Sequence, residues 1–292
     1  SCEYPSTSLS FDGGDYVVFE DSDDWSHGTD DFTIQFWVNL SEFSSNDIPL
    51  VVQTGYGYRN GIYYVSSSNK LLYRFTPSFV DYHNIYASFD LELGEWNHIT
   101  LTRTDGVFRW YANGHQIGEE TEDGASVLNF YSPLYLGRHH DYQNQNNNDW
   151  RLNGLLDEVI IWDYGLTSEE IQSSIINGVD EADPSMLAYW KLDPPNVLDY
   201  SINDHEGVIT GATWIDEAPE FIIGCIDPIA ENYNPEATFN DSSCEYLTGC
   251  MDTIASNYNP EATADDGSCE YPSTSLSFDG GDYVVFEDSD DW

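Results

Sequence analysis

Basic residues are scarce in this chain. It has 8 Lys and Arg side chains against 53 Asp and Glu, which gives a formal net charge of −45 over 292 residues. Nucleic acids and anionic membrane surfaces carry the same sign of charge, so both are repelled by such a protein. We therefore expect neither of them as a partner, and we expect cations to be attracted.

Long apolar runs are missing as well. No stretch approaches the roughly 20 consecutive apolar residues of a membrane-spanning helix, so we expect no membrane insertion. Aromatic residues make up 15% of the chain, whereas disordered acidic segments contain few of them. The composition thus predicts a folded and strongly acidic protein.

Motifs of the common enzyme classes are also absent. The sequence contains no nucleophile elbow and no phosphate-binding loop. Glycosidases need two carboxylates that face one cleft, and the Glu-x-Asp-x-Glu pattern that would place them on one strand face does not occur. We expect a binding or structural protein and not an enzyme.

What the sequence does contain is a perfect internal repeat. Residues 268–292 copy residues 1–25 without a change, at an offset of 267 residues. This predicts a tandem repeat of near-identical 267-residue units, each with one large β-domain and a smaller appendage. An engineered duplication or a single copied segment is the alternative. In an array, neighbouring repeats of the same chain are partners, and lateral self-association into a multi-strand fibre is a further option.

The cysteines fit this repeat. Of the five, Cys2 is the equivalent of Cys269, so one unit owns Cys225, Cys244, Cys250 and Cys269. Four cysteines allow three pairings. The duplication favours the local pairs Cys225–Cys244 and Cys250–Cys269, because each copy must make its own bond. Paired disulfides indicate an extracellular protein, secreted or anchored to the cell surface.

Short apolar segments separated by Gly, Asp and Asn turns run through the first 165 residues. Residues 32–40 alternate with a period of two, and Thr104-Asp105-Gly106 is a hairpin signal. We expect strands at 9–11, 16–19, 32–40, 61–65, 70–75, 85–91, 95–102, 108–112, 116–119, 134–137 and 154–162. This spacing predicts an all-β antiparallel sandwich. One helix is expected over residues 168–176, with Thr167 as its N-cap and Glu169 and Glu170 in its first turn.

Several segments of residues 7–178 carry a family resemblance. LSFDGGDYVVF, FTIQFWVN, GEWNHITLTRTDGVFRWYANG, LYLGR, GLLDEVIIWD and LTSEEIQ follow one another in that order. Together they resemble the laminin G-like, pentraxin-like or concanavalin-like jelly-roll family. The resemblance implies two antiparallel sheets packed face to face, the concave one often used for binding. Residues 186–219 are similar to a segment that commonly follows such domains and adds strands or wraps the sandwich.

The resemblance also implies metal sites. Asp157 matches an aspartate that often binds a structural calcium, with Asp12 or Asp15 nearby, and a capped strand end is the alternative. The stretch 136–141 resembles the calcium-binding stretch of pentraxins, but His139 stands where a carboxylate is expected, so we do not expect that site. The adjacent His139 and His140 point to opposite faces of a strand and make a poor chelate. We expect Trp96 and His98 to be structural.

Residues 224–246 and 249–271 are two copies of one 23-residue motif. Such short segments cannot bury enough apolar area alone, so a disulfide and a metal ion are expected to help. Calcium takes six to eight oxygen ligands, and the candidates are Asp227, Asn232, Asn234 and Asp241 in the first copy and Asp252, Asn257, Asn259, Asp265 and Asp266 in the second. The motif is similar to thrombospondin type 3 repeats, which are calcium-binding linkers of secreted adhesion proteins. The alternative is that these side chains only form and cap turns.

The expected organisation combines these parts. Residues 1–6 end a preceding connector module, 7–222 form the laminin G-like sandwich with its C-terminal extension, 223–247 and 248–272 form two cysteine/calcium modules, and 273–292 begin the next sandwich. We expect a structural and adhesive repeat of a giant extracellular or cell-surface filamentous protein, stiffened by disulfides and calcium. The alternative is a lectin-like module displayed in many copies for avidity, which binds cell-surface glycans by stacking exposed tyrosines on sugars: Tyr56, Tyr58, Tyr82, Tyr86 and Tyr142.

Overall fold

The computed structural model describes residues 7–271 apart from 56–57, 79–80, 122–124, 130, 140–149, 221, 238 and 242, together with residue 280. The chain divides into two compact units, Ser1–Phe221 and Ile222–Trp292. Antiparallel strands dominate the first unit, so the all-β prediction is confirmed. Within the described part of the chain, no helix is long and apolar enough to cross a membrane.

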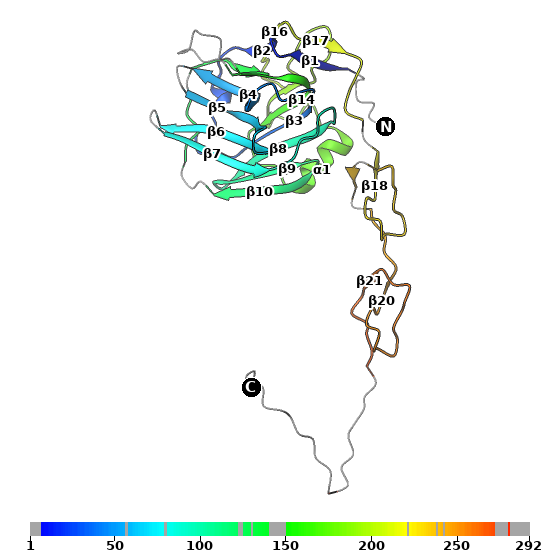
Figure 1. Cartoon of the computed structure of the whole chain (residues 1–292). Coiled ribbons are helices and arrows are strands. Elements are labelled where there is room, and N and C mark those ends of the chain that lie inside the picture. The colour runs from blue at the N-terminus through cyan, green and yellow to red at the C-terminus, as the bar shows by residue number, and fades with distance from the viewer. Residues whose placement is uncertain are drawn as a thin grey trace. The chain divides into compact units, whose positions relative to one another are not determined.

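Two sheets form the first unit and lie over one another as layers (Figure 1). The eight-stranded sheet has the order β10-β9-β8-β3-β14-β1-β17, and β15 also pairs with β14. Its strands are β10 (His115–Thr121), β9 (Val107–Ala112), β8 (Asn97–Thr104), β3 (Phe32–Leu40), β14 (Asn153–Trp162), β1 (Ser8–Asp12), β17 (Thr213–Ile215) and β15 (Met186–Trp190). All of these pairs are antiparallel.

The seven-stranded sheet has the order β16-β2-β11-β4-β5-β6-β7 and is also antiparallel. Its strands are β16 (Val208–Thr210), β2 (Tyr16–Phe19), β11 (Leu134–Leu136), β4 (Asp47–Gly55), β5 (Tyr58–Val65), β6 (Lys70–Ser78) and β7 (Asp81–Ser88). A two-stranded ribbon of β12 (Arg138–His139) and β13 (Trp150–Arg151) contacts β4.

The core fills the space between the sheets. On β3 the alternate residues Phe32, Ile34, Phe36 and Val38 belong to it, which is the period of two that the sequence shows. The C-terminal segment contributes as well: Trp190 of β15 stacks on Phe19 with ring centroids 3.9 Å apart. β17 pairs with β1 and β16 pairs with β2, so residues 186–219 add strands to both sheets.

The helix α1 (Ser168–Asn177) matches the predicted one. Its N-cap forms a capping box, in which Glu170 N donates to Thr167 Oγ1 at 3.2 Å and Thr167 N donates to Glu170 Oε2 at 2.8 Å. The helix lies against the outer face of the eight-stranded sheet, because Ser174 Oγ donates to Gln35 Oε1 of β3 at 3.3 Å. A short 3₁₀ turn, η1 (Asp23–Trp25), follows β2.

Strand β4 was not predicted from the sequence. Its register shifts between Pro49 and Val51, and this irregularity breaks the alternation of inward and outward side chains. A proline within an apolar run also argues against a strand. Strand β7 runs over Asp81–Ser88 instead of the predicted 85–91, and β8 begins at Asn97 and ends at Thr104 instead of spanning 95–102.

The second unit contains two small modules of the same design. Disulfides join Cys225 to Cys244 and Cys250 to Cys269, which is the local pairing that the duplication favours. Each module has one two-residue parallel pair, β18 (Ile223–Gly224) with β19 (Phe239–Asn240) and β20 (Thr248–Gly249) with β21 (Ala264–Asp265). With so little regular structure, the disulfide and side-chain hydrogen bonds must hold each module.

Candidate functional site

An asparagine closes each cysteine module. Asn232 Nδ2 donates to the Ser243 carbonyl at 2.6 Å, while its Oδ1 accepts the Glu245 N–H at 2.8 Å. Asn257 repeats both bonds in the second module, at 2.6 and 2.8 Å. Each side chain therefore ties the middle of its loop to the segment around the closing cysteine.

The other predicted calcium ligands accept hydrogen bonds within their own modules. Asp227 Oδ1 accepts the Ile229 N–H at 3.1 Å, and its Oδ2 accepts the Tyr246 hydroxyl at 2.8 Å. Asp252 makes the same two bonds with Ile254 and Tyr271 in the second module. Asn234 accepts the Glu236 N–H, and Asn259 accepts the Glu261 N–H. The remaining aspartates also accept backbone N–H groups: Asp241 from Ser243, Asp266 from Ser268 and Asp265 from Gly267. Hydrogen bonds from the Ser243 hydroxyl and backbone hold the pKa of Asp241 below its usual range.

These oxygens suit a hard cation in their chemistry, since Asp and Asn oxygens are calcium ligands. None of the nine side chains is buried. They are spread along the turns, however, and among the described residues no three His, Cys, Asp or Glu side chains lie close enough to hold a metal ion. Turn formation therefore accounts for their positions without a metal, and calcium stays a prediction.

Asp157 and Asp12 are not brought together. Asp157 lies on β14 with 1% of its surface exposed, and its Oδ1 accepts the Glu158 N–H at 3.0 Å. The register of β1 places Asp12 opposite Asn153, four residues from Asp157 along β14, or about 13 Å. Asp12 instead forms a turn, in which its Oδ1 accepts the Gly14 N–H at 3.0 Å.

A polar pocket with about 270 Å³ of unfilled space lies between α1 and the outer face of the eight-stranded sheet. Glu158, His98 and Tyr189 line it, and the Tyr189 hydroxyl donates to Glu158 Oε2. Burial raises the pKa of Glu158 to about 7 and lowers the pKa of His98 to about 3. Glu158 is the one carboxylate among the residues that line this pocket, whereas glycoside hydrolysis needs two.

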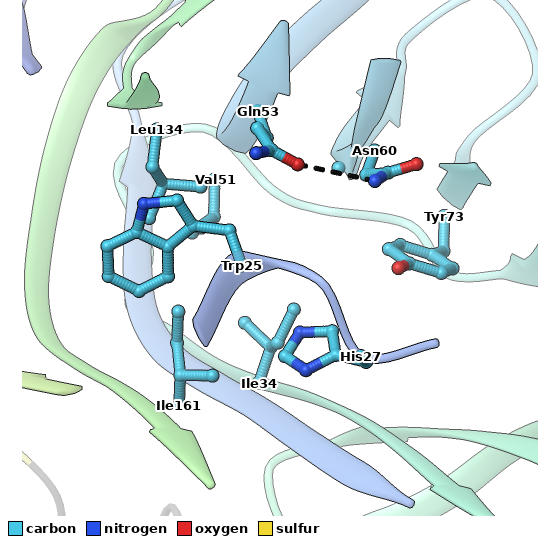
Figure 2. A pocket seen from close by; sticks show the side chains of 10 residues that line it. Trp25, His27, Ile34, Val51, Gln53, Asn60, Tyr73, Leu134 and Ile161 are labelled. Carbon is cyan, nitrogen blue, oxygen red and sulfur yellow. Dashed lines mark hydrogen bonds between the residues drawn. The ribbon is translucent and has the colours of Figure 1, made fainter. Parts of the chain in front are cut away.

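A second pocket lies in the core between the sheets (Figure 2). Two of its polar side chains bond to each other or to the backbone: Asn60 Nδ2 donates to Gln53 Oε1 at 3.3 Å, and Gln53 Nε2 donates to the Ser132 carbonyl at 3.1 Å. His27 stacks on Phe32, and burial lowers its pKa to about 4, so its ring is neutral. These contacts give the pocket a structural role.

The basic residues gather on the opposite side of the molecule from α1. Five of the eight belong to the seven-stranded sheet or to the ribbon that contacts it: Arg59, Lys70, Arg74, Arg138 and Arg151. The other three are elsewhere. Arg103 is buried, Arg109 pairs with Glu119 at 2.8 Å and Lys191 pairs with Glu181 at 2.5 Å.

Two strands of this sheet, β5 and β6, carry basic residues outward, and β7 beside them carries outward tyrosines. The residues Ile62 and Tyr64 of β5, Leu71, Tyr73 and Phe75 of β6, and Ile85 and Ala87 of β7 face the core. Their neighbours in the alternation face outward. On this outer side Val52, Tyr63, Val65 and Leu72 form a small buried apolar cluster, against which Trp150 of β13 packs. We call the polar and aromatic residues of this side the Arg–Tyr face: Arg59 and Tyr63 of β5, Lys70 and Arg74 of β6, Tyr82, Asn84 and Tyr86 of β7, and Trp150.

Aromatic rings flank the cations of the Arg–Tyr face. The Arg59 guanidinium carbon lies 5.3 Å from the Tyr82 ring centroid and 5.5 Å from that of Trp150. Lys70 Nζ lies 5.5 Å from the Tyr86 centroid. Such distances are those of cation–π contacts. Tyr82 and Tyr86 are 47% and 41% exposed, so one side of each ring remains open to solvent.

Hydrogen bonds and an ion pair of partly or fully buried side chains hold this face in place. The Tyr63 hydroxyl and His139 Nδ1 share a hydrogen bond of 2.8 Å, and both residues are buried. Burial raises the pKa of Tyr63, and the nearby Arg59 and Arg74 oppose that rise. Arg74 Nε donates to Asn84 Oδ1 at 2.7 Å, and its Nη1 lies 3.5 Å from Asp47. The strands and these contacts therefore position the cations and rings.

Sequence reasoning found part of this face. It singled out Tyr82 and Tyr86, while Tyr56 and Tyr142 lie outside the described residues, as does the side chain of Tyr58. It missed Arg59 and Trp150. The sequence did contain one signal for this face. Basic residues are rare in the chain, yet three of the eight fall between positions 59 and 74. Asp141 and His140, considered for a pentraxin-type site, lie outside the described residues as well.

Comparison with known proteins agrees with the fold. A family model of the laminin G type, described as the concanavalin A-like lectin/glucanases superfamily, matches residues 11–172. A solved protein of Bacteroides ovatus named for carbohydrate binding superposes with a TM-score of 0.59 at 17% identity, covering 73% of this chain and 60% of its own. A heptameric SAP-like pentraxin from Limulus polyphemus gives 0.50 at 17% identity, covering 73% and 96%. No curated protein sequence matches significantly.

Proposed function

This chain belongs to the concanavalin A-like lectin/glucanases superfamily, and we propose that it is a non-catalytic carbohydrate-binding module of a repeated extracellular adhesive protein. The observation that carries the proposal is the Arg–Tyr face, with two half-open tyrosine rings on β7. The name of the Bacteroides ovatus protein agrees with it. A non-catalytic role is favoured because the polar pocket under α1 presents one carboxylate.

Sugar rings stack on exposed aromatic side chains because burying their C–H faces removes apolar surface from water. Tyr82 and Tyr86 are four residues apart on one strand, about 13 Å. That spacing lets two different rings of an extended oligosaccharide stack at once. The cation beside each ring supplies hydrogen-bond donors for hydroxyl groups.

Loss of one tyrosine ring should weaken glycan binding. Tyr86→Ala in the 292-residue chain is expected to reduce affinity about tenfold, the effect of removing one well-placed aromatic contact. The measurement is a glycan array followed by titration of the retained sugars. Tyr200→Ala is the matched control, since Lys191 Nζ lies 4.4 Å from the Tyr200 ring centroid. Tyr200 is outside the Arg–Tyr face, because its N–H donates to the Tyr189 carbonyl of β15 in the eight-stranded sheet. If no glycan binds to the chain at high micromolar concentration, the proposal is contradicted.

A structural role for the second unit is a separate proposal, favoured by the hydrogen bonds that its two modules share. Each module is closed by one disulfide and one asparagine. In a tandem array such modules serve as the connectors between sandwiches, and the array multiplies weak sugar affinities through avidity. Residues 1–25 and 268–292 are the same sequence, which supports the array.

Calcium binding by the connectors is the accompanying proposal, with Asp227, Asp241, Asp252, Asp265 and Asp266 as its carboxylates. Adding calcium at 100 times its dissociation constant should stabilise the modules by about 2.7 kcal/mol, and EDTA should remove that gain. The measurement is hydrogen exchange of residues 223–271 with calcium and with EDTA. Magnesium is the control, because it binds such flexible oxygen sites poorly. Equal exchange in all three conditions would leave turn formation as the role of these aspartates.

A further inference from the structure

The Arg–Tyr face stands out in charge from the rest of the chain. The whole chain carries −45, yet Arg59, Lys70 and Arg74 lie at outward positions of two neighbouring strands, β5 and β6, with Leu72 between Lys70 and Arg74. The register pairs Gly61 of β5 with Arg74 and Val65 with Lys70, so the three cations spread along the strands instead of clustering at one end.

Two of these cations have no ion pair with any residue that the structure describes. Arg74 pairs with Asp47 at 3.5 Å. Within the described part of the chain, the Arg59 guanidinium lies over the rings of Tyr82 and Trp150, and Lys70 Nζ lies over the ring of Tyr86. In a protein with 53 acidic residues, cations that face aromatic rings instead of carboxylates are placed to receive a negative charge from outside.

The Arg59 side chain is held ready for this role. Thr76 Oγ1 accepts the Arg59 N–H at 3.4 Å and donates to the Arg59 carbonyl at 3.2 Å, which fixes the backbone on both sides. The two flanking rings then restrain the guanidinium plane. A preorganised guanidinium presents its N–H groups as a fork that matches a carboxylate or sulfate oxygen pair.

We propose that the Arg–Tyr face binds an acidic sugar, with Arg59 as the ligand of its carboxylate or sulfate and Tyr82 and Tyr86 as the surfaces on which its rings stack. This inference rests on the proposed carbohydrate-binding function and names the class of sugar. Uronic acids and sulfated sugars share the chemistry of a pyranose ring with a fixed anion.

A sugar fits this face better than an acidic segment of a second copy of the chain. The carboxylates of an acidic peptide would pair with the cations, but they would not stack on the two exposed rings that lie beside them. Stacking and ion pairing at neighbouring positions together match a charged ring.

The test titrates the 292-residue chain with three probes: an oligogalacturonate, the methyl ester of the same oligomer, and a sulfated galactan. We expect one or both anionic probes to bind about ten- to a hundredfold more tightly than the ester, the effect of a hydrogen bond to a charged group, and to weaken as salt rises. The arm that binds identifies the anion as carboxylate or sulfate. Arg59→Gln should abolish the preference for the anionic probe, because it weakens binding of the acid about ten- to a hundredfold and binding of the ester far less.

Arg109→Gln is the matched control, since Arg109 lies on the other sheet and already pairs with Glu119; it should leave every affinity unchanged. Equal binding of ester and acid, or an unchanged preference in Arg59→Gln, overturns the acidic-sugar assignment and leaves the carbohydrate-binding proposal standing. Binding of no probe and no array glycan overturns both. Salt-sensitive dimers that Arg59→Gln dissolves would assign the face to a second copy of the chain instead.

Discussion

Glu158→Gln is expected to stabilise the sandwich by about 3 kcal/mol at pH 8 and to leave its stability nearly unchanged at pH 4. The cause is the buried carboxyl group. Burial raises the pKa of Glu158 to about 7 from its usual 4.5, with the Tyr189 hydroxyl partly opposing the rise. The folded state therefore holds a proton that the unfolded chain has already released between those two values.

The sign follows from this difference in bound protons. Below pH 4.5 both states are protonated, so Glu158 contributes its full share of stability, and this share is lost as the pH rises through 7. A neutral glutamine escapes the loss while its amide oxygen still accepts the hydrogen bond that the Tyr189 hydroxyl donates. Glutamine also keeps the side-chain volume at a position where the backbone φ is 48°.

Urea unfolding at pH 4, 6 and 8 measures the effect as a difference between wild type and variant. Glu92→Gln serves as the control, because Glu92 is exposed in a turn before β8 and the change should be neutral at every pH. A Glu158→Gln variant that is destabilised equally at pH 4 and pH 8 would mean that the carboxylate is needed in its charged form. That result would reopen the pocket under α1 as a site for a cation.

Replacing Cys225 and Cys244 together by serine should unfold the first cysteine module and leave the second one folded. A disulfide that closes a loop of 19 residues contributes roughly 3 kcal/mol by restricting the unfolded chain. The module has no other strong source of stability, since its regular structure is one parallel pair of two-residue strands. The bonds of Asn232 bridge groups that the disulfide brings together, and they should be lost with it.

Hydrogen exchange resolved by residue measures this loss, with protection expected to vanish over 223–247 and to persist over 248–271. The double change of Cys250 and Cys269 to serine is the mirror control and should give the reverse pattern. Asn232→Ala with the disulfide intact should loosen the module only partly. If both modules lose protection in either variant, they fold as one cooperative unit and the repeat is not divided at residue 247.

The sandwich could be predicted from the sequence where alternation and capping are regular. β3 and β14 show a clear period of two, and the Thr167–Glu170 capping box marks the start of α1. Strand β4 was not predicted, because its register shift and Pro49 hide the alternation of inward and outward residues. The strands β16 and β17 are three residues long, and their partners lie about 190 and about 205 residues away in the chain, respectively. No local pattern identifies such pairs.

The site was harder to predict because it depends on which residues share a face. Tyr82 and Tyr86 are recognisable as sugar-stacking candidates from their type alone. That Arg59 lies beside Tyr82 follows from the register across β5, β6 and β7, which residue type does not reveal. Asn232 shows the opposite problem: its residue type favoured a metal ligand, but its hydrogen-bond partners lie 11 and 13 residues away across the disulfide loop.

The pairing of β1 with β17 and of β2 with β16 has a consequence for the biosynthesis of an array. The first strands of a unit lack part of their partners until residue 215 has been made, which takes on the order of ten seconds or more. Soon afterwards residues 275–279 and 283–286 present the same sequences, SLSFD and YVVF, a second time. No side chain distinguishes the two copies, so the order of synthesis alone directs each pair to its own sandwich. Refolding from denaturant lacks that order and would expose an array of the proposed kind to strand exchange between neighbouring units.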